Sequence, residues 1–473
     1  MAGITSFGAY IPFYRLTHKT IAAAWGGRAA DGERAVANVD EDSLTLAVEA
    51  VRDLLANRDG RDVDALIFAS TTSPYNEKQA AAIIATVADL RHDIRAADYT
   101  NSLKSATTAV LTALDSVKAG SANNVIIAAA DTRLAPPRSA NERLFGDAAS
   151  AIEVGNHNVI AELLGAHSTV DEITDVWRKP AADFVSGWEE RFAITQGYQR
   201  VVTSAVQELF ERTAIAPSQI SKAIFYAPDA GSLATVAKSL GLKAEQLPDH
   251  LLQSVGNSGT AMPLLVLSSV LETAQAGDKL LVVGYGSGCD AMLFEVTDKI
   301  KATQAVKRRG VQGYLASKQY LESYERYAKF RDLIDTEGAR RQAPSASASQ
   351  TFRERNDIYR FYGYVCGNCG KVQYPRQRVC IKCQAKDGFE SVRLADKPAT
   401  LFTFTHDFLN ASEDPPTVMT IVDFAGGGRA FLMMTDRNPA EVKIDQALEM
   451  TFRKLYDAEG FLQYYWKCRP LRS

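Results

Sequence analysis

The sequence lacks long hydrophobic segments, and this absence argues against a membrane-spanning helix. Its longest apolar runs, such as residues 280–283, are far shorter than the roughly 20 residues that a helix needs to cross a bilayer. The first residues, MAGITSFGAYIPFYRL, contain no basic segment followed by an apolar one, so no signal peptide is predicted. We therefore expect a cytoplasmic protein with no membrane partner.

An excess of charge of one sign is also missing. The 473 residues include 53 Lys and Arg against 56 Asp and Glu, which gives a formal net charge of −3. So small a charge provides no general attraction to nucleic acid or to an anionic membrane. The hydrophobic share of 46% and the charged share of 23% are those of an ordinary globular protein. The length predicts two to four domains with a large buried core.

Cysteine is scarce, and its placement is uneven. Of six cysteines, four form two CxxC pairs, Cys366 with Cys369 and Cys380 with Cys383. Such clustering is typical of a metal site in a reducing compartment rather than of a disulfide framework. Two CxxC turns can hold one zinc ion by four thiolates. Because four thiolates fill a tetrahedral shell, the spacing predicts a structural zinc ion, not a catalytic one.

The first 300 residues alternate short apolar runs with amphipathic stretches. Two strand–helix–strand units are predicted: residues 63–70, 106–118 and 125–130, and residues 220–227, 263–275 and 280–284. Alternation of this kind indicates parallel βαβ units.

The two units repeat at a constant spacing of 157 residues. The repeated features are a glycine after a helix, an IF pair and an apolar strand: Gly120 and Gly277, Phe68 and Phe225, Val125 and Val282. A constant spacing over three elements indicates a duplicated α/β unit. We predict two halves, about residues 1–155 and 156–300, with the layered α/β architecture of thiolases.

After residue 300 the pattern changes. Residues 313–334 have tyrosines at helical spacing and predict an amphipathic helix, and residues 338–350 have the composition of a linker. Together, residues 301–351 are predicted as a helical linker. Residues 352–395 contain the CxxC pairs and are predicted as a zinc ribbon.

The last 78 residues, 396–473, are rich in predicted strands. Five are expected, at residues 399–409, 416–426, 429–436, 447–457 and 462–470. Five short strands after a ribbon favour an OB-fold barrel. Such barrels often bind nucleic acid, but residues 352–473 hold 18 Lys and Arg against 15 Asp and Glu, with no dense basic patch. We therefore expect no nucleic-acid partner.

Several motifs of the first module resemble one family. These motifs are GITSFGAYIPFYRL at the start, DEDSLTLAVEAVRDLL at 40–55, GDAAS at 146–150, GNSGTA at 256–261 and YGSG at 285–288. In this order they resemble the archaeal type of 3-hydroxy-3-methylglutaryl-CoA synthase. The C-terminal part resembles the zinc-ribbon/OB-fold proteins that accompany thiolase-like enzymes. The resemblance implies coenzyme A as a substrate or product, a homodimer, and a separate thiolase-like subunit as a further partner.

The catalytic positions of that family are mostly substituted here. The family's nucleophilic cysteine stands at a helix N-terminus, where the helix dipole lowers the thiol pKa. By resemblance, that position holds Leu103, and Ser102 lies one residue earlier. The family's glutamate position holds Thr72, and its histidine position, in an FHxP stretch, holds Tyr226. The asparagine of the GN motif matches as Asn257.

Three functions follow from this residue set. The first is making or breaking a carbon–carbon bond next to a CoA thioester, by retro-aldol or CoA-dependent retro-Claisen chemistry, with Asn257 and Tyr226 as hydrogen-bond donors and no acyl-cysteine. The second is acyl transfer of the synthase type with a displaced nucleophile, either Ser102 or Cys289. The third is an inactive CoA-binding scaffold for a partner thiolase. Lys238 resembles a contact to the CoA phosphates.

Overall fold

The computed structural model describes residues 2–56, 58–337, 345, 347–409, 412–458 and 460–472. The chain forms two compact units. The first comprises Met1–Ala37, Asp42–Ala85 and Leu90–Tyr324, and the second comprises Asn38–Glu41, Thr86–Asp89 and Glu325–Ser473. None of the helices in these described ranges combines the length and apolar composition needed to cross a bilayer.

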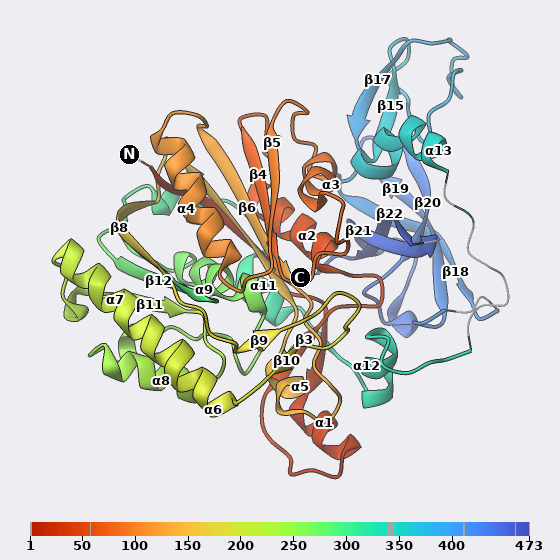
Figure 1. Ribbon diagram of the computed structural model, residues 1–473. Coiled ribbons are helices and arrows are strands. Elements are labelled where there is room, and N and C mark those ends of the chain that lie inside the picture. The colour runs from red at the N-terminus through yellow and green to blue at the C-terminus, as the bar shows by residue number, and fades with distance from the viewer. Residues whose placement is uncertain are drawn as a thin grey trace. The chain divides into compact units, whose positions relative to one another are not determined.

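A nine-stranded sheet organises the first unit (Figure 1). Across the sheet, the strands are β11 (Lys222–Phe225), β12 (Lys279–Tyr285), β13 (Gly288–Val296), β8 (Ala161–Val170), β1 (Gly3–Tyr10), β7 (Ala148–Gly155), β6 (Asn124–Asp131), β4 (Ala65–Ser70) and β5 (Arg95–Thr100). Only two residue pairs, Gly3 with Glu162 and Ile4 with Ala161, join β1 to β8. The sheet therefore consists of two halves that meet at a narrow seam.

The two halves have the same topology, which confirms the predicted duplication. In the first half β4 is parallel to β6, β6 antiparallel to β7, and β7 antiparallel to β1. In the second half β11, β12, β13 and β8 follow one another in the same directions. The edge strand β5 has no counterpart among the strands described in the second half.

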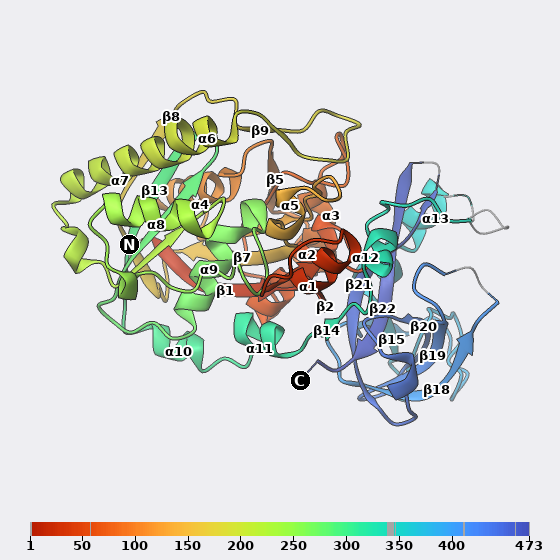
Figure 2. The same cartoon turned by 90° about the horizontal axis from the view of Figure 1, so that it is seen from below.

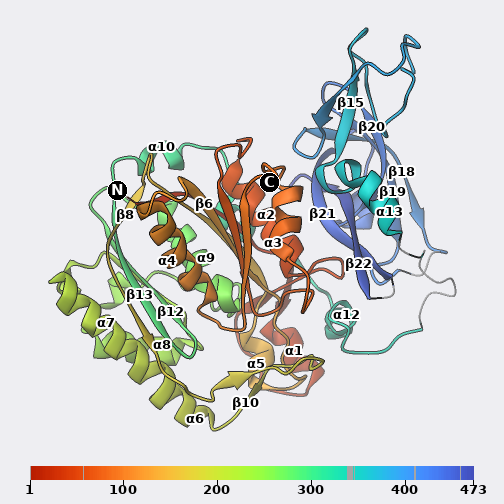
Figure 3. The same cartoon turned by 45° about the horizontal axis from the view of Figure 1, so that its top comes forward.

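Helices cover both halves in layers (Figure 3). The helices that pack on the sheet are α2 (Ser43–Leu55), α3 (Ala80–Val87), α4 (Ser105–Lys118), α7 (Arg200–Thr213), α8 (Ala230–Ser239) and α9 (Met262–Leu271). Side chains of α4 and α9 share one apolar cluster with strands of both halves, so these two helices form the central layer. Helices α7 and α8 cover the outer face of the second half.

The central helices end where the repeat predicts. Gly120 follows α4 with φ of 70°, and Gly277 follows α9 with φ of 90°. Glycine adopts this left-handed conformation without the steric penalty of a Cβ atom. The repeated glycine therefore ends the same helix in each copy and returns the chain to the sheet.

Residues 313–334 do not form the single helix that their tyrosine spacing predicts. They contain the end of α11 (Gly310–Ala316), the short strand β14 (Gln319–Tyr320) and α12 (Tyr324–Phe330). Strand β14 pairs with β2 (Tyr14–Thr17), and β2 pairs with β3 (Glu33–Val36). Pairing with a strand 300 residues away in sequence outweighs the local periodicity, because it satisfies backbone groups that a longer helix would otherwise use.

The predicted module boundary also differs from the structure. The first unit continues to Tyr324 rather than ending near residue 300. It includes α10 (Ile300–Gln304), which lies in the predicted helical linker. Of the predicted linker 338–350, residues 338–344 and 346 lie outside the described residues, and its last residues belong to α13 (Ala348–Arg353).

The second unit contains the predicted ribbon and barrel (Figure 2). The ribbon sheet has the order β16 (Val372–Gln373), β15 (Tyr362–Cys366), β17 (Phe389–Arg393). The closed barrel consists of β18 (Ala399–Asp407), β19 (Thr417–Phe424), β20 (Arg429–Met434), β22 (Phe461–Pro470) and β21 (Ala447–Ala458), in that order. The third and fifth strands pair in parallel and the first pairs with the fourth, which is the OB-fold arrangement.

A buried ion network holds Asn38–Glu41 within the second unit. Arg453 of β21 is fully buried and contacts Asp40 at 2.9 Å, Glu41 at 2.9 Å and Asp436 at 2.5 Å. Lys467 contacts Asp40 at 2.9 Å from the neighbouring strand. Because each buried charge has a partner of opposite sign, the network fixes this segment without leaving an isolated charge.

Candidate active site and zinc centre

Leu103 lies at the entrance of α4, where the resemblance predicted it. The helix begins at Ser105, and Leu103 occupies the turn immediately before it. The Leu103 side chain is 7% exposed and belongs to the apolar cluster that contains Tyr226 and Tyr285. The position of the family's nucleophile is therefore packed with hydrocarbon.

The neighbouring Ser102 hydroxyl is already engaged. Its Oγ donates a hydrogen bond of 3.1 Å to the carbonyl oxygen of Gly286. Gly286 has no room for a side chain, because a Cβ atom would lie 2.8 Å from this same Oγ. Ser102 thus ties the start of α4 to the turn between β12 and β13, and no base is bonded to its hydroxyl in the described residues.

Tyr226 and Asn257 are brought into direct contact. Tyr226 follows β11, Asn257 precedes the short helix η4 (Gly259–Ala261), and both side chains are buried. Asn257 Nδ2 donates to Tyr226 Oη at 3.2 Å and to the carbonyl oxygen of Ala227 at 3.1 Å. Asn257 Oδ1 accepts from the backbone N–H of Gly259 at 2.9 Å, which fixes the orientation of the amide.

This arrangement leaves the Tyr226 proton available. The Tyr226 oxygen accepts from Asn257, and its own O–H has no acceptor among the described residues. A phenol held in this way can donate to a substrate oxygen. Both Asn257 N–H groups are used, so the amide acts on Tyr226 in this state rather than on an oxyanion.

Two further tyrosines adjoin Tyr226, and sequence reasoning missed both. The Tyr285 ring stacks on that of Tyr226 with centroids 6.4 Å apart, and its hydroxyl donates to Asp175 at 2.9 Å. Tyr198 donates to the carbonyl oxygen of Tyr226 at 2.9 Å. Burial raises the pKa of Tyr198 and of Tyr285, so both remain protonated at neutral pH. Tyr285 lies in the recognised YGSG motif, whereas Tyr198 carries no motif signal.

Thr72 is bonded to a buried carboxylate that sequence reasoning did not identify. Thr72 Oγ1 donates to Asp131 Oδ1 at 3.0 Å and accepts from the Thr132 backbone at 2.9 Å. Asp131 ends β6 and is fully buried. It also accepts from Ser70 Oγ, Thr71 N, Thr71 Oγ1 and Thr260 N at 2.7–3.0 Å. Asp131 therefore ties the strand end to the loop that carries Asn257.

The remaining predicted residues lie in unlike environments. Cys289 is fully buried in the cluster that contains Leu103 and Tyr226, and burial, aided by the neighbouring Asp290, raises its thiol pKa. A thiol with a raised pKa is a poor nucleophile because little thiolate forms. Lys238 is exposed on α8 and forms no ion pair within the described ranges.

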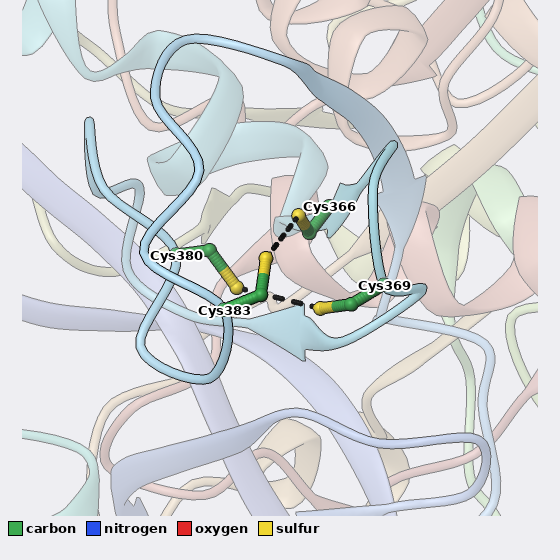
Figure 4. Close-up of side chains that lie close together, drawn as sticks. All are labelled: Cys366, Cys369, Cys380 and Cys383. Atoms are coloured by element: carbon green, nitrogen blue, oxygen red, sulfur yellow. Dashed lines mark hydrogen bonds between the residues drawn. The ribbon is translucent and has the colours of Figure 1, made fainter.

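The four ribbon cysteines converge on one point (Figure 4). Their sulfur atoms all lie within 4.8 Å of one another, with Cys366 to Cys383 at 3.7 Å and Cys369 to Cys380 at 3.6 Å. Sulfur atoms placed about 2.3 Å from a tetrahedral ion would be about 3.8 Å apart. The donor set and spacing therefore fit zinc, and four thiolates make the site structural.

Two family models match parts of the chain. The C-terminal model of 3-oxoacyl-[acyl-carrier-protein] synthase III matches residues 210–296. The ChsH2 rubredoxin-like zinc ribbon model matches residues 354–390, which include all four cysteines. The ribbon match agrees with the zinc site described above.

Solved structures share the fold of the first unit. A hydroxymethylglutaryl-CoA synthase complexed with CoA aligns with a TM-score of 0.63 and 21% identity, over 73% of this chain and 94% of that one. The 3-oxoacyl-(acyl carrier protein) synthase III of Pseudomonas aeruginosa aligns with a TM-score of 0.56 and 21% identity, over 63% and 98%. With the duplicated sheet, these likenesses define an enzyme of the thiolase superfamily.

Curated relatives give the family. The hydroxymethylglutaryl-CoA synthase of Methanocaldococcus jannaschii is 34% identical over 346 residues, 71% of this chain and 99% of the relative. That of Methanopyrus kandleri is 31% identical over 344 residues, 70% and 97%. The chain therefore belongs to the hydroxymethylglutaryl-CoA synthase family, with a zinc ribbon and an OB-fold barrel in addition.

Proposed function

We propose that this protein makes or breaks a carbon–carbon bond next to a CoA thioester without forming an acyl-cysteine. The observation that carries the proposal is the buried Tyr226–Asn257 pair beside Leu103 at the entrance of α4. Family membership supports a CoA thioester as substrate or product, and the apolar residue in the nucleophile position excludes acylation there.

Retro-aldol cleavage of a 3-hydroxyacyl-CoA suits this residue set. The bond between C2 and C3 breaks, and its electron pair forms an enolate with the thioester carbonyl. The C3 hydroxyl loses its proton and becomes a carbonyl, and C2 then gains a proton to give the shorter acyl-CoA. Tyr226 donates its free O–H to the enolate oxygen and relays the proton. Retro-Claisen cleavage uses the same donor, with free CoA attacking the 3-oxo carbon in place of an enzyme thiol.

Asn257 has a positioning role in this proposal. It holds the Tyr226 oxygen and is itself fixed by the backbone of Gly259. A donor fixed before the reaction loses little energy to reorganisation when charge develops on the substrate. The amide thus aims the phenol at the thioester oxygen.

A displaced nucleophile has less support. The Ser102 hydroxyl is bonded to the carbonyl of Gly286, and the Cys289 thiol is buried with a raised pKa. Neither is bonded to a base that would activate it, within the described part of the chain.

A panel of CoA thioesters, incubated with and without free CoA, tests the proposal. We expect cleavage of a 3-hydroxyacyl- or 3-oxoacyl-CoA, and intact-protein mass spectrometry showing no acyl adduct during turnover. An adduct on Ser102 or Cys289 would favour the displaced nucleophile. Binding of acyl-CoA without turnover of any member, even with a partner thiolase added, would favour the scaffold.

We also propose a homodimer. The edge strand β5 pairs only with β4 in the described sheet, and its residues are only partly buried. Unpaired edge strands promote aggregation unless another chain or element covers them. A second copy of this chain, the commonest partner in symmetric oligomers, would provide that cover.

A further inference from the structure

Arg133 is a buried cation without a counter-ion. It lies two residues after the end of β6, and the residue is only 3% exposed. Its guanidinium forms no hydrogen bond or ion pair with any residue that the structure describes, and Nη1 is sealed from solvent without a partner. Other fully buried arginines, such as Arg453, have carboxylate partners.

The surroundings place Arg133 beside the proposed catalytic residues. Its guanidinium carbon lies 4.2 Å from the centroid of the Phe145 ring. Phe145 forms a backbone bridge with Asn257, so the arginine and the amide are held on adjoining segments. At Gly259 a Cβ atom would lie 2.8 Å from Arg133 Cδ, so the arginine stem runs along the loop that follows Asn257.

Two buried hydroxyls in the same loop also lack partners. Ser258 Oγ and Thr260 Oγ1 are sealed from solvent and make no hydrogen bond within the described residues. Buried polar groups in folded proteins are nearly always paired. Three unpaired polar groups around Gly259 therefore indicate a place where a polar ligand completes the site.

An arginine is costly to bury without an anion. Contact with an aromatic face offsets only part of the loss of hydration. Its planar fork fits a carboxylate with two parallel hydrogen bonds. A phosphate of CoA has similar acceptors, but Arg133 adjoins Asn257, where the reacting end of the thioester belongs.

We infer that Arg133 binds a carboxylate on the acyl group of the substrate and thereby determines its specificity. This inference rests on the proposed function to the extent that an acyl thioester occupies the site. The substrate is then a thioester whose acyl chain carries a second, ionised carboxyl group. Ser258 and Thr260 supply further donors to its oxygens.

Binding of matched thioesters to the full zinc-loaded chain tests the inference. Glutaryl-CoA and valeryl-CoA have acyl chains of equal carbon number, and only the first has a free carboxylate. Calorimetry should show glutaryl-CoA binding at least about 10-fold more tightly. Arg133→Gln should abolish this preference and leave valeryl-CoA binding unchanged, whereas Arg133→Lys should retain part of it. Arg200→Gln, which removes a surface ion pair with Asp171, serves as the control.

The corresponding pantetheine thioesters separate the acyl carboxylate from the nucleotide phosphates. The same preference should persist for glutaryl-pantetheine over valeryl-pantetheine. If Arg133→Gln weakens both CoA thioesters equally and neither pantetheine thioester, Arg133 binds phosphate and the inference is wrong. It is also wrong if the wild-type chain shows no preference.

Thermal unfolding without ligand provides a readout that a structural role would not give. Arg133→Met removes an unpaired buried cation, so the melting temperature should stay the same or rise. A fall of several degrees would mean that the arginine supports the fold, which contradicts the inference. If no thioester is cleaved and yet the Arg133-dependent preference is measured, the proposed function fails while this inference stands.

Discussion

The residue before α4 decides which chemistry the site can perform. Leu103 stands where a nucleophilic thiol would profit from the helix dipole, and a hydrocarbon side chain cannot be acylated. The groups that remain able to move a proton are the tyrosines around Asn257. Catalysis here therefore depends on hydrogen-bond donors rather than on a covalent intermediate.

Replacement of Tyr226 by phenylalanine removes the proposed proton donor and little else. We expect kcat/KM for the cleaved thioester to fall on the order of 100-fold, because general acid catalysis typically contributes that much. Steady-state kinetics would measure it. Tyr320→Phe, at an exposed position of the same unit, is the matched control and should have normal activity. Normal activity of Tyr226→Phe would contradict the proposal.

Asn257→Ala should lower activity by acting through Tyr226. Removal of an oxyanion-type donor or its support typically costs about 3 kcal/mol in the transition state. Because both residues serve one donor, the double variant Tyr226→Phe/Asn257→Ala should be little worse than either single variant. Rates measured over this double-mutant cycle check the coupling; additive losses would show that the two residues act independently.

Ser102→Ala and Cys289→Ala should each retain most activity. Ser102 forms a structural hydrogen bond, and the Cys289 thiol is buried with a raised pKa. These assays use the same substrate as the Tyr226 experiment. An inactive Ser102→Ala or Cys289→Ala variant, together with an active Tyr226→Phe variant, would establish a displaced nucleophile instead.

Among the elements, the zinc ribbon depends most directly on a few side chains. Small ribbons have little apolar core, so their folding free energy comes largely from the metal. Cys380→Ser should reduce the zinc content well below one atom per chain and unfold the ribbon, as metal analysis and circular dichroism would show. Cys468→Ala alters a barrel cysteine outside the cluster and should keep zinc stoichiometric.

The buried network around Asp40 should make the second unit sensitive to acid. Burial by itself raises the pKa of Asp40, but Lys467 and Arg453 outweigh it and hold that pKa well below its usual value. A carboxyl with a lowered folded-state pKa stabilises the fold above its unfolded pKa of about 3.9, and this contribution is lost as the pH falls further.

Asp40→Asn should therefore destabilise the second unit at neutral pH, on the order of 3 kcal/mol, as expected when one partner of a buried ion pair is removed. The difference from wild type should shrink below about pH 4. Urea unfolding between pH 3 and pH 7 measures it. Asp423→Asn breaks a solvent-exposed pair with Arg429 and should cost less than about 1 kcal/mol at any pH.

For the whole molecule, the exposed edge of the nine-stranded sheet predicts association. Light scattering at micromolar concentration should report twice the mass of one chain, because β5 is an edge strand without a cover in the described residues. A mass equal to one chain over the same concentration range would contradict the homodimer. Dilution series distinguish a stable dimer from weak association.

The sequence by itself determined the features that depend on local pattern and spacing. The strand–helix–strand repeats, the five barrel strands and the four zinc-binding cysteines follow from hydrophobic periodicity, turn residues and CxxC spacing, which act within a few residues. The glycines after α4 and α9 marked the duplication for the same reason. The resemblance to the synthase family rested on the order of such local motifs.

Only the tertiary structure decided which distant residues meet. Asn257 reaches Tyr226 across 31 residues, Thr260 reaches Asp131 across 129, and Arg133 is brought against Gly259. Strand β14 replaces a predicted helix because β2 lies beside it. These contacts depend on the order of strands in the sheet and on which groups burial leaves without a partner. Neither property can be read from local periodicity, since both arise only when the halves pack together.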